Sequence, residues 1–146
     1  MPILNRHIFT IGLLLAAALP AFAQGQRCKL TYYSRAASTT MEVYVIDAVD
    51  VEPEFPGGEN EMMKYINKHR RYPRRAYESG IEGRVLCGFV VMPNGQISDV
   101  EVIRGVEHSI DREAVRLIKS MPAWRAGTIS HTPVPVYYML PIAFRR

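Results

Sequence analysis

Apolar residues recur at helical spacing in two stretches of the second half of the chain. The first, residues 59–71, follows a chain break at Pro56-Gly57-Gly58 and ends at Tyr72-Pro73, because the residue before a proline avoids the helical region. The second, residues 109–121, has Ser109 as its expected cap and ends at Pro122. Both predict amphipathic helices, with apolar faces made of Met62, Met63, Ile66 and His69 in the first and Ile110, Ala114, Leu117, Ile118 and Met121 in the second.

Three other stretches of this half predict strands. Residues 82–92 and 96–104 are joined by the turn signal Pro93-Asn94-Gly95, so they form a hairpin. Residues 134–144 alternate in the manner of a half-buried strand, and the side chains on one face are Val134, Val136, Tyr138, Leu140, Ile142 and Phe144. Ahead of these, residues 41–51 are rich in β-branched residues and predict a strand without an obvious partner. Residues 24–40 have no clear period and are interpreted as a poorly ordered or loosely packed leader.

The order helix, strand, strand, helix, strand predicts an α+β fold. We expect a three-stranded antiparallel sheet with two helices packed on one face. If every pair is antiparallel, the last strand must lie beside the first. The spatial order is then second, first, last, which makes residues 134–144 an edge strand.

The prolines of the last strand indicate which way its backbone faces. Pro133, Pro135 and Pro141 are all odd-numbered, so their missing N–H groups lie on one side, which must be the side away from the central strand. Tyr137 and Met139 keep outward N–H groups and form a short docking window. Two compatible interpretations remain: the prolines block aggregation through the edge, or they guard an edge that admits one extended peptide.

The first 23 residues are typical of a signal peptide. Arg6 and His7 precede the apolar run of residues 8–18, and Ala21-Phe22-Ala23 offers a small-x-small cleavage site. The run is shorter than the roughly 20 residues that span a bilayer, which favours cleavage over an uncleaved anchor. With 146 residues and a formal charge of +4, the chain is interpreted as signal peptide 1–23, leader 24–52 and one domain, 53–146.

No catalytic, metal or cofactor site is expected. The four histidines are scattered without ligand spacing, and Asp111 and Glu113 are interpreted as residues that stabilise a helix terminus. An oxidising compartment would permit Cys28 and Cys87 to pair, but the pattern favours a surface thiol and a small strand residue. The basic run 68–75 is interpreted as a solvated helix end that could contact an acidic surface or lipid headgroups, and nucleic acid is not expected as a partner.

Residues 53–146 resemble the C-terminal domain of TonB, the energy transducer of Gram-negative envelopes. The matching motifs are Tyr72-Pro73-x-x-Ala76, Gly80-Ile81-Glu82-Gly83, Phe89-Val90-Val91 with Asn94-Gly95-Gln96-Ile97, Glu113-Ala114, the loop from Trp124 to Gly127, and the apolar last strand. The resemblance implies a periplasmic module that binds the N-terminal peptide, or TonB box, of outer-membrane TonB-dependent transporters and supports energy-coupled transport of nutrients. The peptide would pair with Val134, Pro135, Val136, Tyr137, Tyr138, Met139 and Leu140, and Tyr72 and Pro73 would lie near the transporter plug.

Two departures from the TonB pattern define the alternative. First, the N-terminal signal is expected to be cleaved. Second, only about 30 residues separate Ala23 from Pro53, and fully extended they reach roughly 100 Å at best. The alternative is a stand-alone envelope module that binds such peptides without transducing energy. Inner-membrane proton-driven motor proteins would be partners if the signal stays uncleaved. An exposed edge also permits a strand-paired homodimer.

We predict that the mature protein begins at Gln24. Mass spectrometry of the protein isolated from the envelope should find this terminus in the fraction released without detergent. An intact Met1 or Pro2 terminus in the membrane fraction would contradict cleavage and indicate an anchored transducer.

Overall fold

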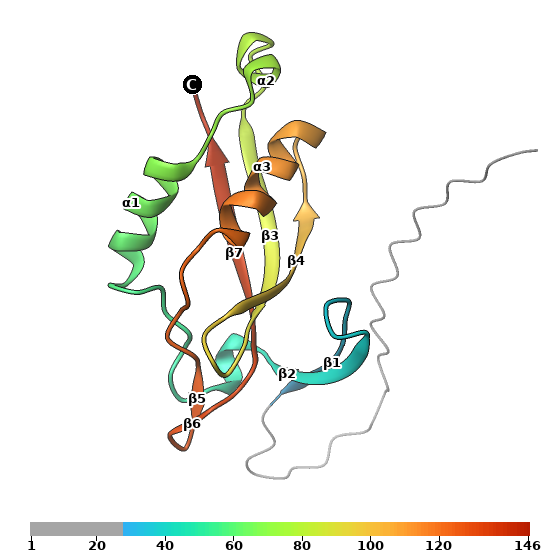
Figure 1. Ribbon diagram of the computed structural model, residues 1–146, viewed down its shortest axis with the longest axis vertical. Helices are drawn as coiled ribbons and strands as arrows, with labels where there is room; N and C mark the ends of the chain where they lie inside the picture. Colours follow the sequence, from blue (N-terminus) through green and yellow to red (C-terminus); the bar gives the residue numbers. More distant parts are fainter. Residues whose placement is uncertain (1–27) are drawn as a thin grey trace, which may run out of the picture.

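A computed structural model describes residues 28–146, so the predicted signal peptide lies outside the described residues. The described chain forms a sheet with helices on one face and a hairpin at its N-terminal end (Figure 1). In chain order the elements are β1 (Lys29–Ser34), β2 (Thr39–Tyr44), the 3-10 helix η1 (Ile46–Ala48), α1 (Glu59–His69), α2 (Arg74–Glu78), β3 (Gly83–Val91), β4 (Ile97–Arg104), α3 (His108–Lys119), β5 (Thr128–Ile129), β6 (Thr132–Pro133) and β7 (Val136–Phe144).

The predicted three-strand unit is present with the predicted neighbours. β3 and β4 form the antiparallel hairpin, and β7 pairs antiparallel with β3 on its other side. The β3–β7 ladder is continuous from Gly83↔Phe144 to Val91↔Val136. The order β4, β3, β7 therefore confirms that the last strand lies beside the first strand of this unit.

The sheet is larger than predicted, and the expectation of three antiparallel strands is wrong in that respect. Its five strands follow the order β1-β2-β7-β3-β4, and β2 meets β7 in parallel at Tyr44↔Val136. Residues 29–44, expected to be mostly leader, form an antiparallel hairpin around a turn where Ser38 has φ 52°. The strand predicted for residues 41–51 ends at Tyr44, because η1 follows.

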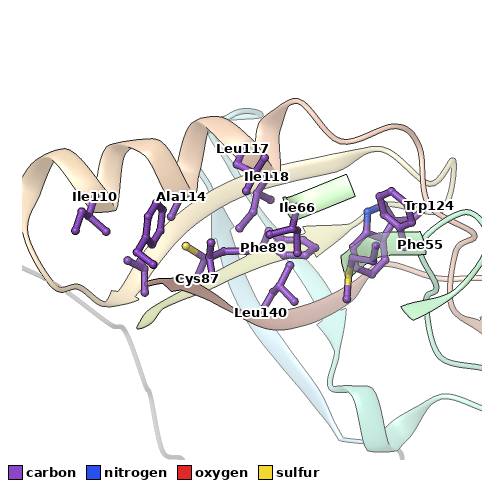
Figure 2. Close-up of a cluster of buried hydrophobic side chains, with 14 of the residues drawn as sticks. Phe55, Ile66, Cys87, Phe89, Ile110, Ala114, Leu117, Ile118, Trp124 and Leu140 are labelled. Atoms are coloured by element: carbon purple, nitrogen blue, oxygen red, sulfur yellow. The ribbon is translucent and has the colours of Figure 1, made fainter. Parts of the chain in front are cut away.

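The helices cover one face of the sheet, as expected. Figure 2 shows α3 residues Ile110, Ala114, Leu117 and Ile118 above Cys87 and Phe89 of β3. Alternate residues of β7 complete the cluster, namely Leu140, Ile142 and Phe144. α1 contributes Met62 and Ile66, whereas Met63, predicted on the same face, is 48% exposed.

Two local predictions at helix ends need correction, and one short helix was not predicted. Ser109 does not cap α3; the cap is Glu107, whose carboxylate accepts hydrogen bonds from the Ser109 N–H and hydroxyl. α1 ends at His69, two residues before the predicted end. A short helix, α2, starts directly after Pro73. A proline interrupts a helix that precedes it, but it is well tolerated at the start of the next helix.

The β1–β2 hairpin lies against the helix-free face of the sheet. Its turn is fixed to Asp99 of β4, whose carboxylate accepts hydrogen bonds from Ser34 Oγ at 2.8 Å and from the Ala36 N–H at 3.1 Å. The Tyr32 ring lies 5.9 Å from the ring of Tyr137. Val90, which points away from the helices by strand alternation, is consequently fully buried.

The two cysteines are free thiols, with Cys28 exposed and Cys87 fully buried in the core. Burial raises the pKa of the Cys87 thiol to about 12. This agrees with the packing role predicted for Cys87. No helix within residues 28–146 is long and apolar enough to cross a membrane.

Replacing Trp124 by alanine should destabilise the fold. Trp124 is 4% exposed and meets Phe55, Phe89 and Tyr138 at ring distances between 5.0 and 6.0 Å. Truncating a buried aromatic side chain costs about 3–5 kcal/mol, so urea unfolding of Trp124→Ala should show a loss of this size. The control is Tyr33→Ala, an exposed aromatic position, and an equal loss in both variants would contradict the role of Trp124 in the core.

Candidate functional site

The outer edge of β7 is the feature that most resembles a binding site. Odd-numbered residues of β7 turn their backbone groups away from β3, and two contacts show this directly. The Pro135 carbonyl accepts a hydrogen bond from the Tyr44 N–H at 2.9 Å. The Ala143 carbonyl accepts one from the Arg70 guanidinium. Pro141 lies opposite Leu86 of β3 and is also odd-numbered. The N–H group that proline lacks would point away from β3, so no hydrogen bond between β3 and β7 is lost.

Both ends of this edge are already occupied. At the start of β7, the parallel bridge from Tyr44 to Val136 engages the residues on either side of Val136, so the Tyr137 N–H turns toward Tyr44. β7 is therefore not an edge strand along its whole length, which corrects the sequence prediction. At the far end, the Arg70 side chain covers the Ala143 carbonyl and lies 5.8 Å from the ring of Phe144.

Between these ends a run of backbone groups stays open. Within residues 28–146 no partner is found for the N–H groups of Met139 and Ala143, or for the carbonyls of Tyr137, Met139 and Pro141. We call residues 137–143 of β7 the open edge. It lies further toward the C-terminus than the window predicted from the prolines, because β2 covers the first part of that window.

The predicted binding residues fall into different environments along β7. Met139 is 58% exposed at the centre of the open edge, whereas Leu140 is buried in the core. Val136 is buried at the bridge to β2. Val134 and Pro135 precede β7, and the Val134 N–H donates to the Gly127 carbonyl at 2.9 Å. These residues before Tyr137 hold the strand in place and leave few groups free for a partner.

The Tyr137 side chain links the open edge to β4 across the helix-free face of the sheet. Its hydroxyl donates to Glu101 of β4 at 2.9 Å, so the side chain reaches across β3. It crosses at Gly88, where a Cβ atom would lie only 1.9 Å from the Tyr137 hydroxyl oxygen. Burial, followed by the hydrogen bond with Glu101, raises the pKa of Tyr137 well above its usual range, so the hydroxyl remains a donor.

Tyr72 and Pro73 lie at the opposite end of β7 from Val134. The Tyr72 hydroxyl donates to the Ile81 carbonyl at 2.5 Å, and its ring meets Phe144 edge-on at 5.7 Å. A nine-residue strand is roughly 30 Å long, so the predicted residues do not form one pocket. The structure instead distributes them along β7, with Met139 near the middle of the strand and Tyr72 beside its C-terminal end.

A buried carboxylate fixes the loop that carries Arg70 and Tyr72. Glu113 of α3 accepts the Arg71 N–H at 2.7 Å and two hydrogen bonds from Arg116, at 2.6 and 2.7 Å. Arg116 also donates to the His69 carbonyl at 3.0 Å. From the sequence, Glu113 is predicted only to stabilise a helix terminus, and its contact with Arg71 is not predicted. Its position on the same helical stripe as Ile110 and Leu117 was the available signal, because an acid on an apolar stripe needs a buried partner.

The described residues offer little for metal or acid–base chemistry. No group of three or more histidine, cysteine, aspartate or glutamate side chains gathers as a metal site within residues 28–146. The basic run 68–75 is partly used in the fold: Arg70 covers the end of β7 and Arg74 pairs with Glu78 at 2.7 Å. The arrangement is suited to holding an extended chain through backbone groups.

Comparison with known proteins identifies the family. The sequence model described as Gram-negative bacterial TonB protein C-terminal matches residues 68–145, more than half of the chain. The chain therefore belongs to the TonB C-terminal family, as the sequence motifs indicated. Proteins of this family are associated with transport and with the cell envelope.

The similar proteins include TonB from two strains of Helicobacter pylori, each 33% identical over 92 residues. The match covers 58% of this chain but only 33% and 32% of those proteins, so the chain spans about a third of their length. Two solution structures of the Helicobacter pylori TonB C-terminal domain are also similar, each with a TM-score of 0.47. They are 26% and 29% identical, and the matches cover 59% and 62% of this chain and 90% and 86% of theirs.

Because Arg71 and Arg116 bind the Glu113 carboxylate, we predict that the stability of the folded protein depends on pH. Burial alone would raise the pKa of Glu113, but the hydrogen bonds and charges of Arg116 and Arg71 outweigh it and hold the pKa below its usual 4.5. A carboxyl with a lowered folded-state pKa stabilises the fold above its unfolded pKa, and this contribution disappears as the pH falls through the folded value.

The difference in unfolding free energy between wild type and Glu113→Gln should therefore be largest near pH 7 and shrink below about pH 4.5. Chemical unfolding at a series of pH values measures it. Glu78→Gln, in an exposed pair with Arg74, is the control and should change stability by less than about 1 kcal/mol. A difference for Glu113→Gln that does not vary with pH would contradict the assignment.

Proposed function

We propose that this chain is a periplasmic module that binds the N-terminal peptide of outer-membrane TonB-dependent transporters by adding it as a strand to the open edge of β7. The observation that carries the proposal is the set of five outward backbone groups without a partner, described above for residues 137–143. Backbone groups of this kind are used by proteins that bind peptides through strand addition. Family membership supports a role in transport.

The spacing of the open groups favours a short extended peptide. Seven strand residues extend over roughly 20–24 Å, which fits a peptide of about the same number of residues. Five hydrogen bonds at about 0.5–1.5 kcal/mol each give about 2.5–7.5 kcal/mol before the cost of association. Binding through the backbone alone is therefore expected to be micromolar or weaker. Side-chain contacts are needed for tighter binding and for specificity.

The far end of β7 is suited to a second contact with the same partner. Tyr72, Pro73 and α2 lie beside the C-terminal end of the open edge, and Tyr77 of α2 is 51% exposed. A transporter whose peptide lies along β7 would meet these residues next. We assign Tyr72 and Pro73 to the contact with the transporter plug.

One observation favours the alternative, a stand-alone binding module that transduces no energy. Residues 29–44 form the hairpin, the Asp50 N–H donates to the Thr128 carbonyl at 2.9 Å, and the Glu54 N–H donates to the Arg125 carbonyl at 3.0 Å. Residues 29–54 are thus held against the domain and do not act as an extended spacer. The identity of the mature N-terminus decides between the two functions.

Met139→Pro tests the open edge. Proline at this position removes an outward N–H, and Pro141 shows that β7 accepts proline at a residue of the same parity. We expect the variant to stay folded and to bind transporter N-terminal peptides about three- to tenfold more weakly, equivalent to one lost hydrogen bond. Isothermal titration calorimetry and thermal melts measure both properties.

The matched control is Tyr138→Pro, which removes an N–H directed at Phe89 of β3. This variant should lose stability, because the change interrupts the β3–β7 ladder. If Met139→Pro remains folded and binds as tightly as wild type, the peptide does not pair with this edge.

A further inference from the structure

A cavity lies directly beside the open edge. It has a volume of about 390 Å³ and is bounded by the start of α1, the segment before it, the loop after α3, and β7. Three aromatic side chains form part of its wall: Phe55, Trp124 and Tyr138. Figure 2 shows Phe55 and Trp124 next to each other at one end of the core cluster. Carboxylates of the segment before α1 and of α1 itself form another part of the wall.

Two of these carboxylates have no counter-charge among the residues that the structure describes. Glu54 is paired with Arg125, but Glu52 and Glu59 make no ion pair or side-chain hydrogen bond within residues 28–146. Burial raises the pKa of Tyr138, and the charges of Glu52 and Glu59 raise it further. Both carboxylates therefore lie close enough to the Tyr138 ring to act on the same part of the cavity. Aromatic rings and unpaired carboxylates together attract cations.

The aromatic part of the wall is firmly held. The Trp124 ring lies 5.0 Å from Tyr138 and 6.0 Å from Phe55, with interplanar angles of 67° and 84°. Trp124 is 4% exposed, and its indole Nε1 is buried without a hydrogen-bond partner in the described residues. A buried donor without an acceptor is uncommon in folded proteins. Here it belongs to the wall of the cavity that adjoins the open edge.

Tyr138 connects the cavity to the open edge. It stands between Tyr137 and Met139, which turn their backbone groups outward, while its own side chain points to the helix face. In an added strand, alternate side chains point to that face and lie about 4.5–5.5 Å from the side chain opposite. One side chain of an added peptide would therefore enter the cavity beside Tyr138 and Glu59.

We infer that this cavity selects a peptide with a lysine or arginine at the position opposite Tyr138. The inference rests on the proposed function, because the peptide must first pair with β7. The carboxylates of Glu52 and Glu59 neutralise the cationic group, and the rings of Tyr138 and Trp124 enclose its aliphatic stem. An acidic residue at the same position is rejected by the two negative charges.

A lysine scan tests the selection. Seven-residue peptides with blocked termini and one lysine in an otherwise uncharged sequence, differing only in the position of that lysine, are titrated against the full chain, with norleucine and glutamate peptides for comparison. We expect one position at which lysine binds about five- to tenfold more tightly than norleucine, and glutamate weakest. Trp124, the single tryptophan, lines the cavity, so its fluorescence should change only with the preferred lysine peptide.

Glu59→Gln should abolish the lysine preference and leave norleucine binding unchanged. Glu61→Gln is the matched control, because Glu61 also lies in the first turn of α1 but does not line the cavity. A scan with no preferred position, or a preference that survives in Glu59→Gln, overturns the inference while the proposed function stands.

If no peptide binds, the proposed function fails, and N-acetyl-lysine methylamide then serves as the probe. A tryptophan fluorescence change that depends on Glu59 would support the cation site by itself. The absence of such a change would overturn the site as well.

Discussion

The ladder between β3 and β7 is the constraint on which the rest of the structure depends. It is continuous over all nine residues of both strands, and it fixes which face of β7 each side chain takes. Ile142 and Phe144 are thereby directed into the core, and Pro141 is directed away from the ladder. The pairing of β3 with β7 thus determines both which side chains of β7 enter the core and which of its backbone groups lie at the open edge. A shift of one residue would exchange them and leave Pro141 facing the central strand.

Segments far apart in the sequence define the two ends of the open edge. β2 reaches Val136 from the N-terminal hairpin, and Arg70 reaches Ala143 from the loop after α1. That loop is in turn held by Glu113 of α3. Each contact uses a backbone carbonyl or N–H, so none requires a particular side chain on β7. The length of the edge is therefore controlled by residues outside the strand.

Much of the fold could be predicted because its signals are local. The Asn94-Gly95 turn, the proline after each predicted helix, and the alternation in residues 134–144 each depend on neighbours within a few positions. The β1–β2 hairpin was missed although Thr31, Tyr32, Thr39 and Thr40 are good strand formers. Its attachment depends on Asp99 and Val136, about 65 and 90 residues away, and periodicity carries no information on such contacts.

The sequence predicted on which side of β7 the candidate site lies, but not how many residues of that side are open. The proline parity indicated correctly which side of β7 faces outward, since this follows from backbone geometry alone. The same pattern could not show that β2 covers the region before Tyr137, or that Arg70 covers Ala143. The buried role of Glu113 was hidden for a similar reason, because its hydrogen-bonding partner Arg71 lies 42 residues away along the chain.

The single parallel bridge at Tyr44 and Val136 has a consequence for any strand that joins β7. β2 lies in the same line that an added strand would follow, and it ends where the open groups begin. A peptide longer than the open edge must turn away at β2 or displace it. The end of β2 thus determines where a bound strand can start. It therefore also determines which residue of the bound strand faces each residue of β7.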